Sequence, residues 1–219
     1  MDIRSEEELL TRARALGGRT LSEIARSLRD LPAGDPTRHK GAIGTLVEHA
    51  LGVPKSTRSE PDFKALGVEL KTLPVDPRGR PCESTFVTSA PRNPELDWEH
   101  SSVKRKLDRV LWIPIAADGP LASRRVGSAF LWSPDPETMQ RLRYDWEELT
   151  ELLTSEPDRV SARHGKALQL RPKGRDSSVR IRAMALDGSQ VLALPRAFYL
   201  RRTFTEEMLR RVGFWMGQS

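Results

Sequence analysis

The stretch PDFKALGVELKTLPVD (residues 61–76) has the alternating pattern of a buried strand, but charged side chains interrupt it. Because strand side chains point alternately to two faces, Val68 and Leu70 are expected on one face and Glu69 and Lys71 on the other. Asp62 precedes Glu69 by seven residues, which gives the spacing D-x6-E-x-K. We expect the apolar face to anchor the strand to the core, and the charged face to form the floor of a site.

The spacing is typical of metal-assisted phosphodiester hydrolysis. Mg²⁺ prefers oxygen ligands and keeps several waters, so Asp62 and Glu69 together with a substrate phosphate would suffice to bind it. A bound metal activates water, and Lys71 would orient that water and oppose the negative charge that develops on the phosphate. The D-x6-E-x-K motif also has a simpler interpretation. About one E-x-K is expected by chance in a chain of this length. A solvent-facing ion pair on an edge strand contributes only ~0–1 kcal/mol, and Asp62 would then be a turn or cap residue.

Glu48 is a further acidic candidate. It lies beside the apolar stripe of a helix predicted for about residues 43–50. From this position it can point toward the strand as another metal ligand, or outward as an ordinary surface glutamate. The pattern alone leaves both interpretations open.

The composition limits the class of protein. The 219 residues carry 36 Lys and Arg against 30 Asp and Glu, a net charge of +6, and the sequence pI is about 9.8. Such a balance favours an anionic partner, most often nucleic acid, with simple solubility as the alternative. No apolar run approaches the ~20 residues of a membrane helix, and the beginning of the chain lacks a signal-peptide pattern. The single cysteine, Cys82, excludes an internal disulfide framework and is typical of a cytoplasmic protein.

Helical and strand patterns alternate along the chain, which predicts an α/β or α+β enzyme-like body. Ser5 with Glu8 and Thr20 with Glu23 have the spacing of capping boxes, so two helices are expected in the first forty residues. Further helices are expected over residues 98–107, from residues 134–136 to 153, and from Thr205. The predicted strands after the opening stretch are STFVTS, RVLWIPI, FLWS, ALQLRP, VRIRAMAL and QVLAL.

A DNA-binding regulator without enzymatic activity is a rival interpretation. RTLSEIARSLRDLP (residues 19–32) resembles the first helix of a helix-turn-helix. A recognition helix should begin a few residues later, but LPAGDP (residues 31–36) contains two prolines and a glycine. These residues oppose a second helix, so the first is better explained by packing.

Longer blocks carry a family resemblance. In order, they are KGAIGTLVEHALG, DFKALGVELKTLPVDPRGRPCESTFV, KRKLDRVLWIPI, RRVGSAFLWSP, DWEEL, ARHGKALQLRPKG and LPRAFYLRRTF. Together they closely resemble the MutH family of DNA mismatch repair endonucleases, over nearly the whole chain.

The resemblance implies a restriction-endonuclease-like α/β fold, with a mixed central sheet flanked by helices. Residues 1–219 would form one domain of two lobes around a DNA-binding cleft, with catalytic residues within about 40–110 and a DNA-reading region within about 165–205. The implied reaction is a Mg²⁺-dependent nick 5′ of the G in hemimethylated GATC, in the unmethylated strand, activated by MutL and MutS. One active site favours a nicking monomer over a restriction endonuclease that cuts both strands of GATC.

Carried over by position, the family's catalytic triad falls on Asp62, Glu69 and Lys71. Its helix-borne acidic residue falls on Glu48, a third candidate metal ligand. A basic residue that supports DNA binding or catalysis falls on Lys106.

The resemblance places base recognition in the loop that contains Arg171 and Lys173. Lys40 is a candidate phosphate contact, since it precedes the helix that carries Glu48. Phe86 and Tyr199 are candidate aromatic contacts, with Tyr199 able to sense the adenine methyl group. Their pattern alone fits core residues of alternating strands equally well.

Overall fold

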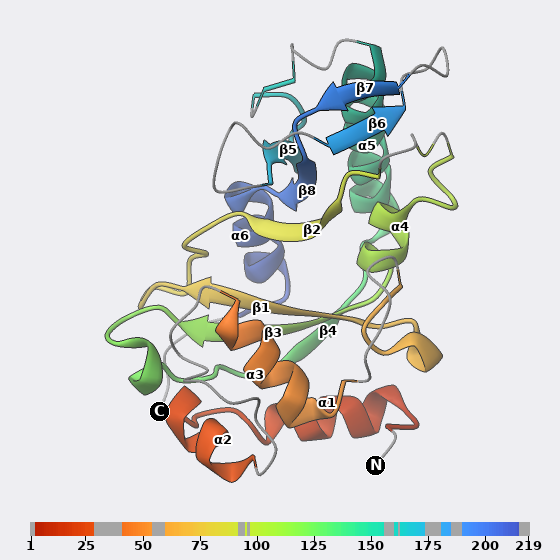
Figure 1. Ribbon diagram of the computed structural model, residues 1–219. Helices are drawn as coiled ribbons and strands as arrows, with labels where there is room; N and C mark the ends of the chain where they lie inside the picture. The colour runs from red at the N-terminus through yellow and green to blue at the C-terminus, as the bar shows by residue number, and fades with distance from the viewer. Residues whose placement is uncertain are drawn as a thin grey trace. The chain divides into compact units, whose positions relative to one another are not determined.

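The fold is a mixed α/β arrangement in which helices pack against sheets (Figure 1). It is seen in a computed structural model that describes residues 3–28, 41–53, 60–91, 95, 97–155, 160–161, 163–173, 181–184 and 190–214. The chain divides into two compact units. The first comprises Met1–Glu83, Asp108–Ser133 and Leu209–Ser219, and the second comprises Ser84–Leu107 and Pro134–Met208. The predicted α/β class is confirmed.

The first unit contains a mixed three-stranded sheet. Its strands, in spatial order, are β1 (Glu69–Val75), β3 (Val110–Ala116) and β4 (Phe130–Trp132). β1 and β3 are parallel, and β4 runs antiparallel to β3. Residues 69–75 of the stretch PDFKALGVELKTLPVD therefore form an edge strand of this sheet. The neighbouring strand, β3, is buried along almost its whole length.

Three helices cover one face of this sheet: α1 (Glu6–Arg14), α2 (Leu21–Ser27) and α3 (Ala42–Leu51). In Figure 1 they are drawn in red and orange on one side of β1 and β3. Val68 and Leu70 belong to the same buried cluster as apolar residues of these helices and of β3. The prediction that one face of β1 anchors the strand to the core is thus confirmed.

The caps of the first two helices follow the predicted spacing to different degrees. Thr20 and Glu23 form a complete capping box, in which each side chain accepts the other residue's backbone N–H. Ser5 accepts the N–H of Glu8, but the Glu8 carboxylate accepts from the N–H of Arg4 instead of Ser5. The first capping box is therefore only half formed.

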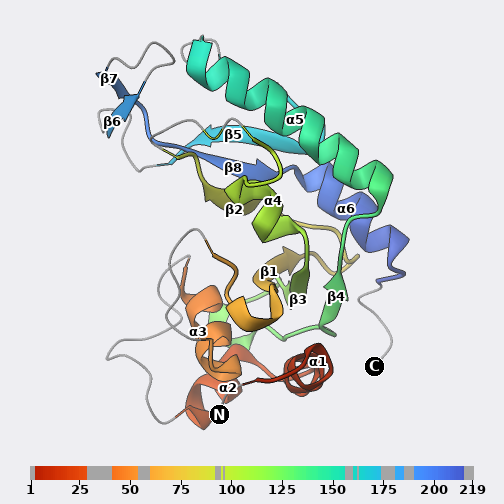
Figure 2. The same cartoon turned by 90° about the vertical axis from the view of Figure 1, so that its right-hand side faces the viewer.

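The second unit is built on an antiparallel sheet. Its strands, in spatial order, are β2 (Thr85–Ser89), β8 (Arg196–Leu200) and β5 (Leu168–Pro172), and a separate hairpin pairs β6 (Ile181–Met184) with β7 (Gln190–Ala193). The remaining helices are α4 (Ser102–Leu107), α5 (Pro136–Ser155) and α6 (Arg202–Arg211). Figure 2 shows α5 running alongside β5. The rings of Trp98 and Trp146, whose centroids are 5.6 Å apart, fasten the segment before α4 to α5.

Two helix boundaries and one strand differ from the sequence-based prediction. α4 begins at Ser102 because Ser101 caps it, accepting the N–H of Lys104 on its hydroxyl. α6 begins at Arg202, so Thr205 lies inside the helix and its hydroxyl donates to a carbonyl of the preceding turn. β8 was not among the predicted strands. None of the helices in the described ranges is both long and apolar enough to cross a bilayer.

Candidate active site

A short turn brings Asp62 to the start of the strand that carries Glu69. Phe63 and Val68 form an antiparallel bridge around the turn, and Gly67 takes a φ of 67°, a left-handed conformation that favours glycine. Asp62 and Glu69 are the residues that flank this bridge, one on each side of the turn. The Asp62 carboxylate accepts the backbone N–H of Leu70 at 2.9 Å. The D-x6-E spacing is thus explained by the length of the turn.

Glu69 and Lys71 form an ion pair that is almost completely buried. Lys71 Nζ lies 3.1 Å from Glu69 Oε1, and the two residues are only 6% and 4% exposed. Although β1 is an edge strand, the alternative of a solvent-facing surface pair is therefore wrong. Removing two charges from water costs several kcal/mol per ion, so a buried pair of this kind is weak evidence for stability and is better explained by function.

The charged face of β1 continues onto β3 at Trp112. Trp112 is the register partner of Lys71 in the parallel pair, so the two side chains share a face of the sheet. Its side chain is fully buried, and its indole Nε1 has no hydrogen-bond partner among the described residues. A second hydrogen-bond donor therefore lies on the same face as the ion pair.

The donor set fits a hard divalent cation that is only partly ligated by protein. Asp62 and Glu69 supply carboxylate oxygens from opposite sides of the turn, and Mg²⁺ in hydrolytic sites commonly uses one or two carboxylates while keeping its waters. Within the described part of the chain, no three His, Cys, Asp or Glu side chains gather as a potential metal cage. Two carboxylates next to a lysine match Mg²⁺ better than zinc, which takes three or four protein ligands.

The two other residues of the predicted catalytic set lie on helices. Glu48 is half-buried on α3, and its Oε1 lies 3.9 Å from the position that a Cβ on Gly44 would take, so the carboxylate extends along its own helix. Lys106 is 7% exposed on α4, in the second unit. The structure brings Asp62, Glu69 and Lys71 together, whereas Glu48 is not part of a three-residue metal cluster.

Four of the five predicted DNA-reading residues come together on the sheet of the second unit. Phe86 on β2 is paired with Tyr199 on β8, and their rings meet edge to face with centroids 5.6 Å apart. The Arg171 guanidinium lies 5.7 Å from the centre of the Tyr199 ring, and the Lys173 ammonium lies 5.0 Å from the centre of the Phe86 ring. We call these four residues the aromatic–cationic cluster. Lys40 falls outside the described residues.

The exposure of the cluster argues against a core role. Phe86 is 41% exposed, Arg171 and Lys173 are exposed, and Tyr199 is half-buried. Cations held over aromatic rings with open surface beside them can contact both a phosphate and a base. Gln169 shares the Tyr199 face through its register, and its amide donates to Ser84 at 2.7 Å. Gln169 was not among the candidate residues predicted from the sequence, because a polar residue between two leucines has no distinguishing pattern.

Comparison with known proteins agrees with this geometry. A family model described as the DNA mismatch repair enzyme MutH matches residues 51–145, a span that includes Asp62, Glu69, Lys71 and Lys106. The DNA mismatch repair protein MutH of Klebsiella pneumoniae is 49% identical over 213 residues, which is 94% of this chain and 92% of that protein. The protein of the same name from Salmonella paratyphi C is 49% identical over 212 residues, with the same two coverages. The chain therefore belongs to the MutH family of DNA mismatch repair endonucleases.

Proposed function

We propose that this protein is a Mg²⁺-dependent endonuclease that nicks the unmethylated strand 5′ of the G in hemimethylated GATC. The observation that carries the proposal is the buried Glu69–Lys71 pair, with Asp62 hydrogen-bonded to the backbone N–H of Leu70 between them. A buried ion pair is costly to desolvate and adds little to stability. Metal-assisted phosphodiester hydrolysis can use carboxylates to bind Mg²⁺ and a nearby lysine to oppose negative charge.

In this mechanism Asp62 and Glu69 hold Mg²⁺, which when bound lowers the pKa of a water and offsets charge on the phosphate. Lys71 orients the attacking water by donating a hydrogen bond to it, and faces the phosphate oxygen on which negative charge develops. The water oxygen forms a bond to phosphorus and one phosphodiester P–O bond breaks. The proton of the water leaves to solvent, and the released sugar oxygen takes up a proton from solvent to become a hydroxyl. Glu69 keeps the Lys71 ammonium in place through the 3.1 Å contact.

Glu48 and Lys106 complete the proposed catalytic set. Glu48 would complete or assist a second metal site from α3, and Lys106 would support DNA binding or catalysis from α4. Both roles are proposed from family membership.

The aromatic–cationic cluster is the proposed reading surface. Arg171 can donate two parallel hydrogen bonds to guanine O6 and N7, a pairing that discriminates by about 1–3 kcal/mol. Lys173 would contact an acceptor beside it, and Phe86 and Tyr199 offer ring faces and edges to bases. Tyr199 would sense the adenine methyl group, and Lys40 would contact a phosphate.

The proposed partners are double-stranded DNA with GATC sites and the mismatch repair proteins MutL and MutS. We expect a monomer, because one catalytic triad per chain cuts one strand per binding event. We also expect the protein in the cytoplasm. A restriction endonuclease that cuts both strands would require two such sites acting together on one duplex.

The test is to incubate the protein with hemimethylated, fully methylated and unmethylated GATC duplexes, with Mg²⁺ or EDTA, and to resolve each strand separately. Mg²⁺-dependent cutting confined to unmethylated strands is expected. Simultaneous cutting of both strands of unmethylated GATC would favour the restriction endonuclease. Binding without cleavage in every condition, even with MutL added, would overturn the proposal in favour of a non-enzymatic regulator.

A further inference from the structure

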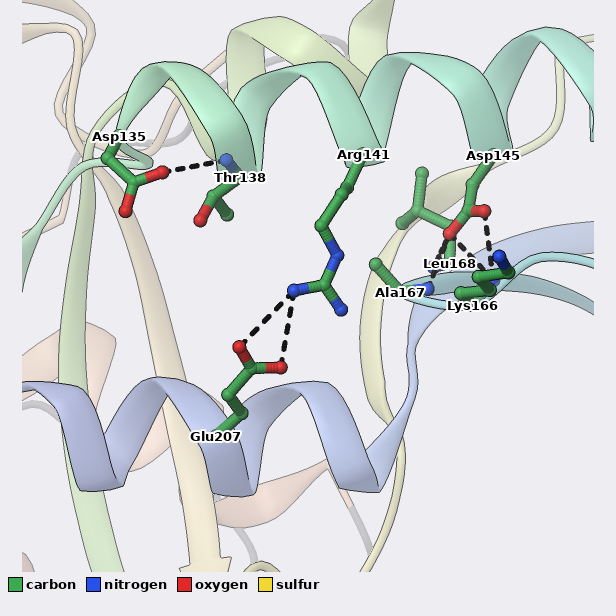
Figure 3. A network of polar contacts seen from close by, with 8 residues as sticks. All are labelled: Asp135, Thr138, Arg141, Asp145, Lys166, Ala167, Leu168 and Glu207. Atoms are coloured by element: carbon green, nitrogen blue, oxygen red, sulfur yellow. Dashed lines mark hydrogen bonds and ion pairs between the residues drawn. The ribbon is translucent and has the colours of Figure 1, made fainter.

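A buried carboxylate holds the loop that leads into β5. Asp145 on α5 is 6% exposed and accepts three consecutive backbone N–H groups. Lys166 donates to both of its oxygens at 2.9 Å, and Ala167 and Leu168 donate to Oδ2 at 2.5 and 2.8 Å (Figure 3). Hydrogen bonds to an ionised carboxylate are about twice as strong as neutral ones, so this contact is a strong restraint on the loop.

The other side of the same loop is held from the end of β8. The Arg201 guanidinium donates to the carbonyls of His164 and Gly165 at 2.8 and 2.9 Å, and its backbone N–H donates to Ala167 at 2.8 Å. Gly165 has a φ of 74°, and a Cβ there would lie 2.2 Å from the Leu168 carbonyl oxygen. The loop over residues 164–168 is thus clamped from α5 and from β8 in a single conformation.

The clamp lies directly before β5, the strand that carries Arg171 and leads directly into Lys173. Leu168, the last of the three N–H donors, is the first residue of β5, and Arg171 follows it by three positions. β5 is an edge strand, paired with β8 alone in its sheet. Because side chains alternate along a strand, a slip of one residue would turn Arg171 away from Tyr199. An edge strand has only one neighbour to set its register, so the clamp adds the second restraint.

The position of this carboxylate on α5 is also informative. Asp145 stands on the buried side of the helix, beside Leu142, Trp146 and Leu149. An apolar residue at position 145 would pack with these buried side chains, whereas a buried carboxylate must be compensated by hydrogen bonds. The compensation is provided by the backbone N–H groups of the loop before β5.

We infer that Asp145 is a positioning residue for base recognition: by clamping the loop over residues 164–168, it sets the register in which β5 presents Arg171 and Lys173. The inference rests on the proposed function, since it takes those two side chains as DNA-reading groups. Asp145 acts through them and has no contact with DNA in this account.

The test uses the full-length Asp145→Asn variant on hemimethylated GATC and on duplexes with one of the four base pairs changed. Asparagine keeps the size of the side chain, but it removes the negative charge and replaces one of the two accepting oxygens with an NH₂ group, which weakens the contact with the loop. We expect the ratio of kcat/KM between GATC and the altered sites to fall about tenfold, toward the ratio of Arg171→Ala. The change should be mainly in KM, with kcat at saturating GATC within about threefold of the unmodified protein. The double variant Asp145→Asn/Arg171→Ala should discriminate no worse than Arg171→Ala alone, because both changes remove the same interaction.

Two controls separate positioning from a general loss of stability. Leu149→Ala removes a buried apolar side chain of the same helix, which has no group that could accept the loop's N–H groups. Glu207→Gln breaks the 3.2 Å ion pair with Arg141 between α5 and α6 (Figure 3). Measured well below their unfolding temperatures, both should keep the discrimination ratio. Arg201→Gln weakens the opposite side of the clamp and should lower the ratio as Asp145→Asn does, which provides a second test if Asp145→Asn does not fold.

The inference is overturned if the folded Asp145→Asn or Arg201→Gln protein discriminates like the unmodified protein, or if Leu149→Ala loses discrimination to the same extent at equal stability. Failure of the unmodified protein to nick GATC would instead refute the proposed function. The two failures are therefore distinguishable in one series of reactions.

Discussion

Lys71 neutralises Glu69 inside the protein: their charged atoms are 3.1 Å apart and about 95% of each side chain is buried. Breaking a buried pair by removing one partner typically costs 3–5 kcal/mol, because the other charge stays buried, whereas replacing both partners is often neutral. The Glu69–Lys71 pair should therefore affect the free energy of unfolding as well as the proposed activity.

The first prediction compares the removal of one partner of this pair with the replacement of both. In urea titrations, Lys71→Met should have a lower free energy of unfolding than Glu69→Gln/Lys71→Met, by roughly 3–5 kcal/mol. Neither protein should nick GATC, and both should retain most of their DNA affinity while folded. Lys71→Ala should likewise abolish nicking and largely spare binding. Equal stability of the single and double variants, or normal nicking by Lys71→Ala, would contradict the assigned role.

A second prediction concerns Asp62, which has a structural contact and a proposed metal contact. Asp62→Asn keeps an oxygen for the Leu70 N–H, so its stability without metal should stay close to that of the unmodified protein. Asp62→Ala leaves that N–H without this acceptor and should cost about 1–3 kcal/mol. Both should lose nicking. Mg²⁺ should raise the unfolding temperature of the unmodified protein in proportion to its binding, and should raise that of Asp62→Asn less. An equal Mg²⁺ effect on both proteins would remove Asp62 from the ligand set.

The site was predictable where its geometry is local. The D-x6-E-x-K spacing favoured one site for Asp62 and Glu69 while leaving a simpler interpretation open, and a single short turn brings Asp62 to the start of the strand that carries Glu69. The burial of the Glu69–Lys71 pair was not predictable, because an edge strand with alternating charges looks the same whether or not other segments cover it. The approach of Arg171 to Tyr199 depends on the register of β5 against β8, which joins segments that are far apart in the sequence.

The fold, too, was predictable for elements with a strong local pattern and not for those that depend on distant segments. The apolar run of β3 and the long amphipathic pattern of α5 were recognised, since each has a strong period of its own. β8 was missed as a strand although it is the central strand of its sheet, because its five residues lie between Pro195 and two arginines and have little pattern. The pairing of β8 with β2 and β5 stabilises it, and neither partner is adjacent in the sequence.

A third prediction concerns Arg171 and Lys173 on the reading surface. Arg171→Lys keeps the charge but loses the two-pronged donor, so it should lose discrimination between GATC and altered sites nearly as completely as Arg171→Ala. Lys173→Ala should weaken binding to GATC and to the altered sites alike. If Lys173 contacts a phosphate, the salt dependence of the binding constant should fall by about one counterion. Fluorescence anisotropy across a salt series measures both effects. Arg26→Ala, which removes an exposed arginine on α2, is the matched control and should change neither. Unchanged site preference in Arg171→Lys would exclude a bidentate contact to a base.

The last prediction is a pH dependence that originates at the start of β3. The side chain of Arg109 donates to the Glu6 carboxylate, with Nε 3.0 Å from Oε1, and its backbone carbonyl accepts the N–H of Glu69. The hydrogen bond from Arg109 holds the pKa of Glu6 below its usual value of 4.5, although partial burial acts in the opposite direction. A carboxyl whose pKa is lowered by folding stabilises the folded state above the unfolded-state pKa, and this contribution is lost as the pH falls through the lower, folded-state value.

The comparison is between the unmodified protein and Glu6→Gln, with the free energy of unfolding measured from pH 7 to pH 3. Glutamine resembles the protonated carboxyl, so the difference between the two proteins should be largest near neutral pH and should shrink below about pH 4.5. Since the Glu6 side chain is 39% exposed, solvent screening should limit the difference to less than about 1 kcal/mol. Concentrated salt should reduce it further at pH 7. A difference that stays constant down to pH 3 would mean that Glu6 stabilises α1 through packing alone, and that the ion pair with Arg109 does not contribute to holding the strand beside Glu69.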